Sequence, residues 1–382
     1  MKKSLLIIGL LFSVHVFAQK KSKDNTPKTY DLLIGTYTTG DSKGIYVYRF
    51  YTETGRVAYL NQVEGIDNPS YLCVASNNRF VYSVNEVGAD RKGSVSSFSF
   101  EPQTGKIALL NKQASTGTGP CYISIDKKRS HVFVANYQSG ALSVLPVNKD
   151  GSLSPVVQTI QDSGHGANKA RQEGPHVHTA VLSPDEKYLL YTDLGTDKLN
   201  IYRYKPSQDQ PLNLSDPFSV SVAPGHGPRH IDFSADKKFM YLMTEMGGTV
   251  YVYNYNGGKP QQLQSISIVP DNYKGAIGGA DIHVSPDGNF LYCTDRGDDN
   301  TIIVFAINKE TGRLTFVERV SSRGKTPRNF AIDPSGKFLL VANQNSNDIY
   351  VYVIDKVTGK LVITNNKITV GNPSCLKFTP AE

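Results

Sequence analysis

Residue types that supply acid–base chemistry and bind anions gather at two repeated places in this chain. Imidazole titrates close to neutral pH, carboxylates exchange protons, and guanidinium groups pair with phosphate or carboxylate oxygens. The first place is a short loop that leads into a strand-like run, and the second is the turn that ends the following run. The residues concerned are His176, His178, Arg229, His230, Asp281, His283 and Arg328 in the loops and Glu245 and Arg296 in the turns.

A repeat with a period near 50 residues positions these loops and turns. Similar segments begin at residues 68, 119, 174, 227, 278, 326 and 372, and each reads as a strand, a polar turn and a second strand. Further strand-like runs follow, so that a full unit contains four. This period with four strands per unit is typical of propeller blades. We therefore predict an all-β, seven-bladed β-propeller with four antiparallel strands per blade.

The two ends of the chain are expected to share one blade. The unit at residue 372 supplies one strand, whereas residues 30–37, 45–50 and 57–60 supply three strands that precede the first full unit. Together they complete a blade, and closure removes the exposed edges of an open array. Residues 29–382 are thus predicted to form a single domain. The first strand of each blade would line a central channel, and the polar loops and turns would open on one face of it.

Each polar residue taken alone could instead satisfy the backbone at a turn. The concentration of four of the eight histidines in these loops, and the variation in residue type between equivalent loops, favour a site.

The N-terminus has the features of an export signal. Lys2 and Lys3 precede an apolar run over residues 5–17, and residues 16–18 have the pattern of a cleavage site. We expect residues 1–18 to be a signal peptide and residues 19–28 to be a disordered lead-in. The mature protein would be periplasmic or secreted, without a membrane span. If the segment is not a signal, the protein would be cytoplasmic.

Composition and cysteine spacing narrow the ligand class. The formal net charge of +7 falls to about +5 without the two lysines of the signal, and basic residues are interspersed with acidic ones. We expect a bias towards anionic ligands and no nucleic-acid partner. Cys73, Cys121, Cys293 and Cys375 stand singly, so neither a metal nor a cofactor site is predicted. A disulfide remains an alternative to buried free thiols, and Cys121 is interpreted as a small apolar residue.

Several strings resemble the bacterial lactonase family of seven-bladed propellers, and the likeness extends over residues 30–380. They are GPHVHTAVLSPDEKYLLYTDLG from residue 174, GPRHIDF from 227, ADIHVSPDGNFLYCTDRG from 280 and GKTPRNFAIDPSGKFLLVANQ from 324. That family contains a 6-phosphogluconolactonase and is related to fungal carboxy-muconate cyclases. The resemblance implies a hydrolase or cyclase whose partner is a small anionic lactone or sugar acid.

The resemblance also implies a site made of a histidine, a glutamate and two arginines. The matching positions here are His176 or His178, Glu245, Arg229 and Arg296. Where the family often has asparagine before the glutamate and the second arginine, this chain has Thr244 and Asp295. This departure leaves the substrate open.

A lactonase reaction assigns roles to these residues. We expect Glu245 to act as general base after burial raises its pKa, and one of the two histidines to protonate the ring oxygen, although these roles could be exchanged. Arg229 would stabilise the developing oxyanion. Arg296 and Arg328 would hold a phosphate or carboxylate of the substrate. Further substrate contacts are expected from His230, Asp281 and His283.

Three functions remain open at this point. The favoured one is a lactone hydrolase of the 6-phosphogluconolactonase type, acting as a monomer or weak dimer. The alternatives are a muconate-type lactone cyclase or isomerase and a non-catalytic propeller that binds a sugar acid or a protein. An export signal argues against 6-phosphogluconolactone itself, which is a cytoplasmic metabolite. Residues 163–172 lengthen one of the loops and are either a lid or a tolerated insertion.

Overall fold

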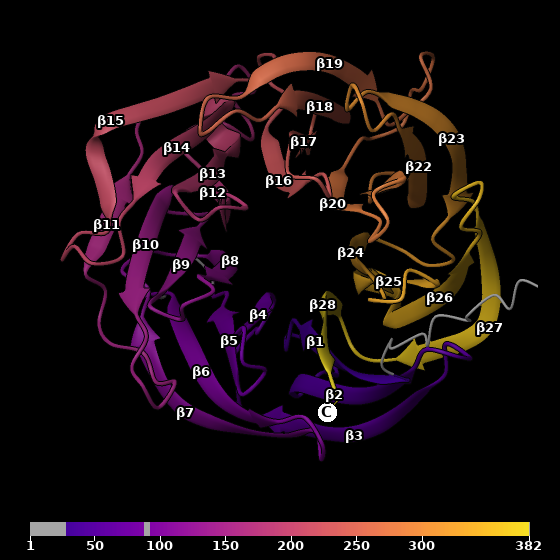
Figure 1. Cartoon of the computed structure of the whole chain (residues 1–382), viewed down its shortest axis with the longest axis horizontal. Helices are drawn as coiled ribbons and strands as arrows, with labels where there is room; N and C mark the ends of the chain where they lie inside the picture. Colours follow the sequence, from indigo (N-terminus) through magenta and orange to yellow (C-terminus); the bar gives the residue numbers. More distant parts are fainter. Residues whose placement is uncertain (1–27, 88–91, 382) are drawn as a thin grey trace, which may run out of the picture.

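The computed structural model describes residues 28–87 and 92–381. These residues form seven four-stranded sheets that surround a central axis as blades (Figure 1). The predicted all-β, seven-bladed propeller is confirmed. The predicted signal peptide, residues 1–18, and residues 19–27 of the predicted lead-in lie outside the described residues. Within the described part of the chain, no helix is both long enough and apolar enough to cross a membrane.

The blades are numbered here from the one that contains both ends of the domain, and each is given from its inner to its outer strand. Blades 1 to 3 are β28 (Pro373–Pro380), β1 (Thr29–Thr36), β2 (Gly44–Tyr51) and β3 (Val57–Glu64); β4 (Leu72–Val74), β5 (Phe80–Asn85), β6 (Ser94–Glu101) and β7 (Lys106–Ala114); and β8 (Pro120–Ile125), β9 (His131–Asn136), β10 (Ala141–Pro146) and β11 (Gln158–Gln161).

Blades 4 to 7 follow the same order. They are β12 (Val177–Leu182), β13 (Tyr188–Asp193), β14 (Lys198–Tyr204) and β15 (Leu212–Ser221); β16 (Pro228–Phe233), β17 (Phe239–Thr244), β18 (Thr249–Asn254) and β19 (Gln261–Ser267); β20 (Gly279–Val284), β21 (Phe290–Asp295), β22 (Thr301–Ile307) and β23 (Leu314–Ser321); and β24 (Pro327–Ile332), β25 (Phe338–Asn343), β26 (Asp348–Ile354) and β27 (Leu361–Thr369). Short 3₁₀ turns follow β13 (Leu194–Thr196) and β25 (Gln344–Ser346).

Blade 1 closes the ring by pairing the two ends of the chain. Strand β28 runs antiparallel to β1, with Tyr30 opposite Pro380 and Thr36 opposite Pro373. The remaining two strands of the sheet, β2 and β3, also come from the N-terminal side. The predicted shared blade is confirmed, and the inner edge of β1 is covered by the last strand of the chain (Figure 1).

Neighbouring blades pack through the second strand of each sheet, which is apolar on both faces. In β13, Leu189 and Tyr191 join an apolar cluster with Phe133 of blade 3. Leu190, between them in sequence, joins a different cluster with Leu242 of blade 5. Alternate residues of a strand point to opposite faces, so a strand covered on both sides must be apolar throughout. This packing fixes the inner strands around the axis.

In six of the seven blades, the pairing of the first and second strands is irregular close to the first residue of the inner strand. In blade 5, Pro228 pairs with Thr244 and His230 pairs with Met243, so Arg229 between them has no partner in the second strand. A β-bulge of this kind takes the extra residue out of the ladder and re-aims its side chain. Equivalent skips occur in blades 3, 4, 7 and 1 at Cys121, His178, Arg328 and Ser374. These skipped positions are named the bulge ring.

Candidate active site

A pocket of about 190 Å³ lies where the bulge ring meets the turns that end the second strands. Its volume is below the roughly 300–1,000 Å³ of sites for drug-sized molecules, which suits a small ligand. Arg171 contributes to it from the loop over residues 163–172. The other lining residues are Cys121, His178 and Arg328 of the bulge ring and Tyr37, Glu86, Tyr137, Glu245 and Arg296, each of which directly follows a second strand.

The structure distinguishes the two histidines that the sequence left as alternatives. Val177 pairs with Asp193, the last residue of the second strand, so the skipped residue His178 is equivalent to Arg229. His178 lines the pocket. His176 lies at its margin, where its ring stacks on Tyr137 with centroids 4.5 Å apart and its Nε2 lies 3.2 Å from Glu173. The geometry therefore favours His178 as the site histidine.

Glu245 lies within a cluster of arginines and is only 4% exposed. Its Oε1 accepts a hydrogen bond from Arg171 at 2.7 Å, and its Oε2 lies 2.8 Å from Arg296 Nη2 and 3.1 Å from Arg229 Nε. Burial by itself raises the pKa of Glu245, but attraction from the three guanidinium groups outweighs burial and holds the pKa below its usual range. The expected upward shift is therefore wrong. Glu245 stays ionised and is a weak base.

Arg229 is almost completely enclosed, with 1% of its surface exposed. Besides Glu245, it contacts the backbone oxygen of Ala280, and its Nη1 lies 3.3 Å from Nε2 of His230. Burial and the nearby positive charges of Arg296 and Arg328 lower the pKa of Arg229 to about 10, so it is protonated at neutral pH. Arg229 is not among the residues that line the pocket, and it contacts the pocket residue Glu245.

Arg328 has no acidic partner within ion-pair distance among residues 28–87 and 92–381. Its guanidinium group lies over the ring of Tyr37, 5.4 Å from the centroid. The hydroxyl of Tyr37 donates to Glu86 at 2.7 Å, and Ser70 also bonds this carboxylate. Glu86 is therefore occupied by hydroxyl groups, which leaves the donors of Arg328 available to an anionic ligand.

His178 combines burial with a lack of partners. His178 is 3% exposed, and its buried Nδ1 forms no hydrogen bond with any described residue. Its ring contacts the rings of His230 and Tyr137 edge-on, at centroid distances of 5.2 and 5.6 Å. Burial, with added repulsion from Arg229 and the other nearby cations, holds its pKa well below the usual value. At neutral pH His178 is therefore an uncharged imidazole.

The pocket carries an excess of positive charge. Four arginines, Arg171, Arg296 and Arg328 at its surface and Arg229 behind it, face the two carboxylates Glu86 and Glu245. With His178 neutral, two positive charges remain uncompensated. Charges in a site of low dielectric attract a ligand of opposite sign more strongly than they would in water. The pocket therefore suits an anion or a reaction in which negative charge develops.

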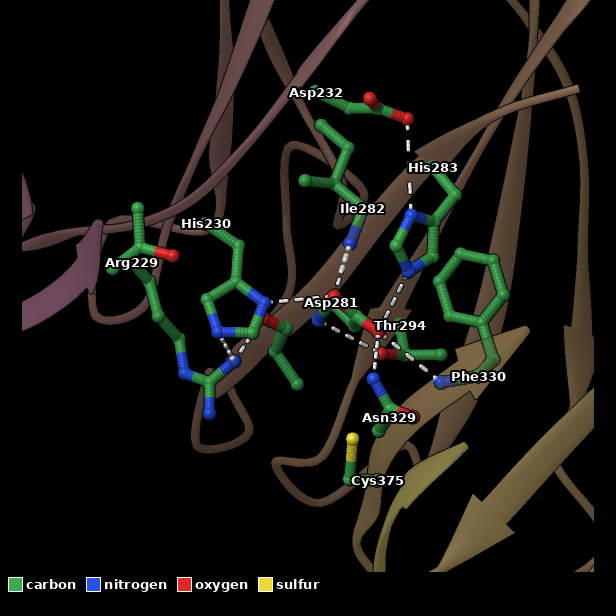
Figure 2. A network of polar contacts seen from close by, with 12 residues as sticks. Arg229, His230, Asp232, Asp281, Ile282, His283, Thr294, Asn329, Phe330 and Cys375 are labelled. Atoms are coloured by element: carbon green, nitrogen blue, oxygen red, sulfur yellow. Dashed lines mark hydrogen bonds and ion pairs between the residues drawn. The ribbon is translucent and has the colours of Figure 1, made fainter. Parts of the chain in front are cut away.

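Three other residues expected to bind substrate do not line the pocket. His230, Asp281 and His283 form a network beside it (Figure 2), in which the Asp281 carboxylate accepts from His230 Nδ1 at 2.7 Å and from His283 Nε2 at 3.1 Å. Asp281 is 1% exposed and His230 is 4% exposed. None of the three is among the residues that line the pocket, and His230 meets it only through its edge-on contact with His178.

The loop over residues 163–172 contributes one residue that the sequence did not identify, Arg171. Gln172 anchors the loop, because it is fully buried and bonds the backbone oxygen of Leu194 and the amide of Asn168. Arg171 then reaches Glu245 and, at 3.3 Å, the hydroxyl of Tyr137. The insertion thus completes the wall of the pocket. Its length was the only signal in the sequence, and length does not say which side chain points inwards.

The two departures from the family pattern lie at buried turns. The hydroxyl of Thr244 donates to the backbone oxygen of Thr249 and accepts from its amide, both at 3.0 Å. Asp295 accepts from the amides of Gly278 and Gly297 at 2.8 and 3.0 Å. Both side chains therefore support the turns that present Glu245 and Arg296, and neither lines the pocket.

The cysteines are free thiols. Cys121 lines the pocket but is 4% exposed, and burial raises its pKa, so it is a poor nucleophile. Among the residues that the structure describes, no group of three or more His, Cys, Asp or Glu side chains is arranged to hold a metal ion.

Comparison with known proteins gives a match along nearly the whole chain. The family described as "Lactonase, 7-bladed beta-propeller" matches residues 31–378. The 6-phosphogluconolactonase of Bacillus subtilis (strain 168) is 38% identical over 347 residues, which are 90% of this chain and 97% of that protein.

Solved structures agree with this match. A putative 6-phosphogluconolactonase from Bacteroides fragilis is 39% identical, with a TM-score of 0.89 over 94% of this chain and 100% of its own. The periplasmic gluconolactonase PpgL of Pseudomonas aeruginosa is 42% identical, with a TM-score of 0.88 over 93% of this chain and 100% of its own. The chain therefore belongs to the lactonase family of seven-bladed β-propellers.

Proposed function

We propose that this protein hydrolyses the lactone of a sugar acid to the free acid in the pocket between the bulge ring and the second-strand turns. The observation that carries the proposal is that one small pocket contains the neutral, buried imidazole of His178 and the guanidinium group of Arg328, which has no acidic partner among the described residues. The membership of the lactonase family and relatives named 6-phosphogluconolactonase and gluconolactonase support the same reaction.

His178 is the candidate for activating water. A neutral imidazole takes a proton from the water molecule as its oxygen attacks the lactone carbonyl carbon. The tetrahedral intermediate then carries a negative charge on the former carbonyl oxygen. When the carbon–oxygen bond of the ring breaks, the same imidazole, now protonated, returns the proton to the departing alkoxide. One water is consumed, and the product is the hydroxy acid.

Arg328 and Arg296 are the candidates for stabilising the oxyanion. Both line the pocket, and a fixed cation aimed at developing charge stabilises the transition state more than the neutral substrate. Glu245 takes a different role from the expected base, because both of its carboxylate oxygens are already paired with guanidinium groups. By pairing with Arg296 and Arg171 it holds these cations at fixed places.

The excess positive charge favours a substrate with an acidic group. Whether this group is a phosphate is a finer question, on which the relatives differ: the names of two specify a phosphogluconolactone and that of a third a gluconolactone. Export bears on the same question. The features of residues 1–18 and a periplasmic relative support a location outside the cytoplasm, where a non-phosphorylated sugar lactone is the more available substrate. N-terminal sequencing of the native protein tests this location, and retention of Met1 would overturn it.

The proposed activity is tested by titrating released acid at constant pH. The substrates are gluconolactone, 6-phosphogluconolactone and a neutral aliphatic lactone, each corrected for spontaneous hydrolysis. We expect saturable hydrolysis of a sugar lactone and a loss of about 10²–10⁴-fold in kcat for His178→Asn. His165→Asn, which changes an exposed histidine, is the control and keeps full activity. Absence of turnover with all three lactones would favour a binding protein, and an unimpaired His178→Asn would remove His178 from the mechanism.

A further inference from the structure

The hydrogen bonds of the network beside the pocket (Figure 2) determine which of its nitrogen atoms carry protons. The Asp281 carboxylate receives hydrogen bonds from His230 Nδ1, His283 Nε2, the Asn329 side chain and the amide of Phe330. A carboxylate has only lone pairs to offer, so each of these partners must be a donor. His230 therefore carries its proton on Nδ1.

This tautomer determines what the other nitrogen of His230 can do. With Nδ1 protonated and the ring neutral, Nε2 holds a lone pair and is an acceptor. Burial and the adjacent positive charge of Arg229 lower the pKa of His230 to about 3, which agrees with a neutral ring. The only charged donor near Nε2 in the described structure is Nη1 of Arg229, at 3.3 Å. His230 thus offers Arg229 a lone pair that Asp281 keeps correctly oriented.

Contacts with three different groups hold the guanidinium group of Arg229. Its Nε faces Glu245, and its Nη1 faces both His230 and the backbone oxygen of Ala280. A guanidinium group is planar and donates in fixed directions, so contacts on different nitrogens define its orientation. Because Arg229 is 1% exposed, solvent cannot replace a lost contact. Arg229 is in turn one of the three guanidinium groups that hold the Glu245 carboxylate.

We propose that His230 and Asp281 are positioning residues that set the orientation of Arg229 against Glu245 and thereby the arrangement of the pocket cations. This inference rests on the proposed lactone hydrolysis for its catalytic readout. His230 also contacts the ring of His178 edge-on. The order of action is Asp281 on His230, His230 on Arg229, and Arg229 on Glu245.

A double-mutant cycle tests the order of action. His230→Phe keeps a ring that can pack on Tyr71 and Tyr122 but removes both nitrogens. In the wild-type background we expect kcat/KM to fall about 10- to 100-fold, mostly in kcat, because misplacement of a charged group by a fraction of an ångström has effects of this size. In an Arg229→Gln background the same change should cost less than about twofold. Equal losses in both backgrounds would overturn the proposal.

Two further variants keep the result interpretable. Asp281→Asn retains the shape of the side chain and removes its charge, so it serves if His230→Phe does not fold. It should lower kcat about 3- to 10-fold, and this loss should likewise vanish in the Arg229→Gln background. Tyr71→Phe is the matched control, because Tyr71 contacts the same face of the network through its ring and donates nothing to Arg229. It should leave kcat and KM unchanged.

The design separates failure of this inference from failure of the proposed function. Wild-type turnover on the lactone panel reports on the function alone. If no lactone is hydrolysed, the readout of the same mutant cycle is the dissociation constant of gluconate, measured by titration calorimetry. Coupling between His230 and Arg229 in that constant supports the positioning, and strict additivity overturns it.

Discussion

Replacing Glu245 by glutamine tests how the arginine cluster is held together. The substitution keeps the shape of the side chain and an acceptor oxygen but removes the charge. Glu245 is 4% exposed and faces three guanidinium groups within 3.1 Å. Without it, Arg229 becomes a buried cation without a counterion, and repulsion among the pocket arginines is no longer offset.

The magnitude follows mainly from Arg229. Removing one partner of a buried ion pair costs about 3–5 kcal/mol, because it leaves the other charge uncompensated. The Arg171 side chain is 46% exposed, so solvent screens its pair with Glu245 and that pair adds little. At about 2 °C per kcal/mol for a large domain, the melting temperature should fall by about 6–10 °C.

The assay is thermal unfolding of both proteins at one scan rate, with urea unfolding as a check. Glu101→Gln is the matched control, because Glu101 pairs with Lys106 at 3.8 Å and both side chains are more than half exposed. It should melt within about 1 °C of the wild type. A Glu245→Gln variant that melts like the control would refute the reasoning, since Arg229 would then not depend on this carboxylate.

Other predictions concern the unpaired arginine, the buried histidine and the shared blade. Arg328→Gln should lower kcat/KM about 10²–10³-fold in the constant-pH assay. Arg203→Gln is the control and should keep full activity, because Arg203 also lies over a tyrosine ring but is remote from the pocket. Equal activities of the two variants would contradict the oxyanion role of Arg328. Burial lowers the pKa of His283, but the carboxylates of Asp281 and Asp232 outweigh burial and raise the pKa of His283 to about 9, above its unfolded value of 6.5. The resulting stabilisation is complete below pH 6.5 and is lost as pH rises through 9, so the melting temperature of wild type should decline over this range more than that of His283→Gln. Deleting residues 372–382 should remove β28 and abolish cooperative melting, and an unchanged melt would contradict the role of β28 in closure.

The fold was predictable because the repeat is visible in the sequence. Each unit carries its own strand and turn signals, and the incomplete unit at the C-terminus, with three spare strands at the N-terminus, indicates how the ring closes. The face that carries the site was also predictable, since turns in equivalent blades must lie together. Tyr37, Glu86 and Tyr137 lie at the equivalent turns, each directly after a second strand, and line the same pocket.

The register within one blade was not predictable. In most blades the bulge residue directly follows a proline, as Arg229 follows Pro228. In blade 4, Val177 takes the place of this proline. Pro175 therefore lies two residues before that place, and His178 rather than His176 takes the bulge position. The sequence offers both histidines after a proline, and only strand pairing decides between them.

Charge interactions between blades were the second gap. The pKa of Glu245 depends on three arginines that are far apart in the chain, and a single-residue argument from burial gives the wrong sign. The same holds for Asp281, whose side chain receives partners from blades 5, 6 and 7. Local sequence identifies residues that titrate, but the balance of charges around each depends on contacts that only the closed ring creates.

The pairing of β28 with β1 has a consequence for how the chain is made. Strand β1 is synthesised near the start, and its partner consists of residues 373–380, so the inner edge of β1 stays unpaired until translation is almost complete. An unpaired strand edge is a template for association with other chains, and contacts of such long sequence separation form slowly. The nascent protein therefore has an extended period in which it cannot become a closed ring, and during this period the unpaired edge of β1 is available to chaperones.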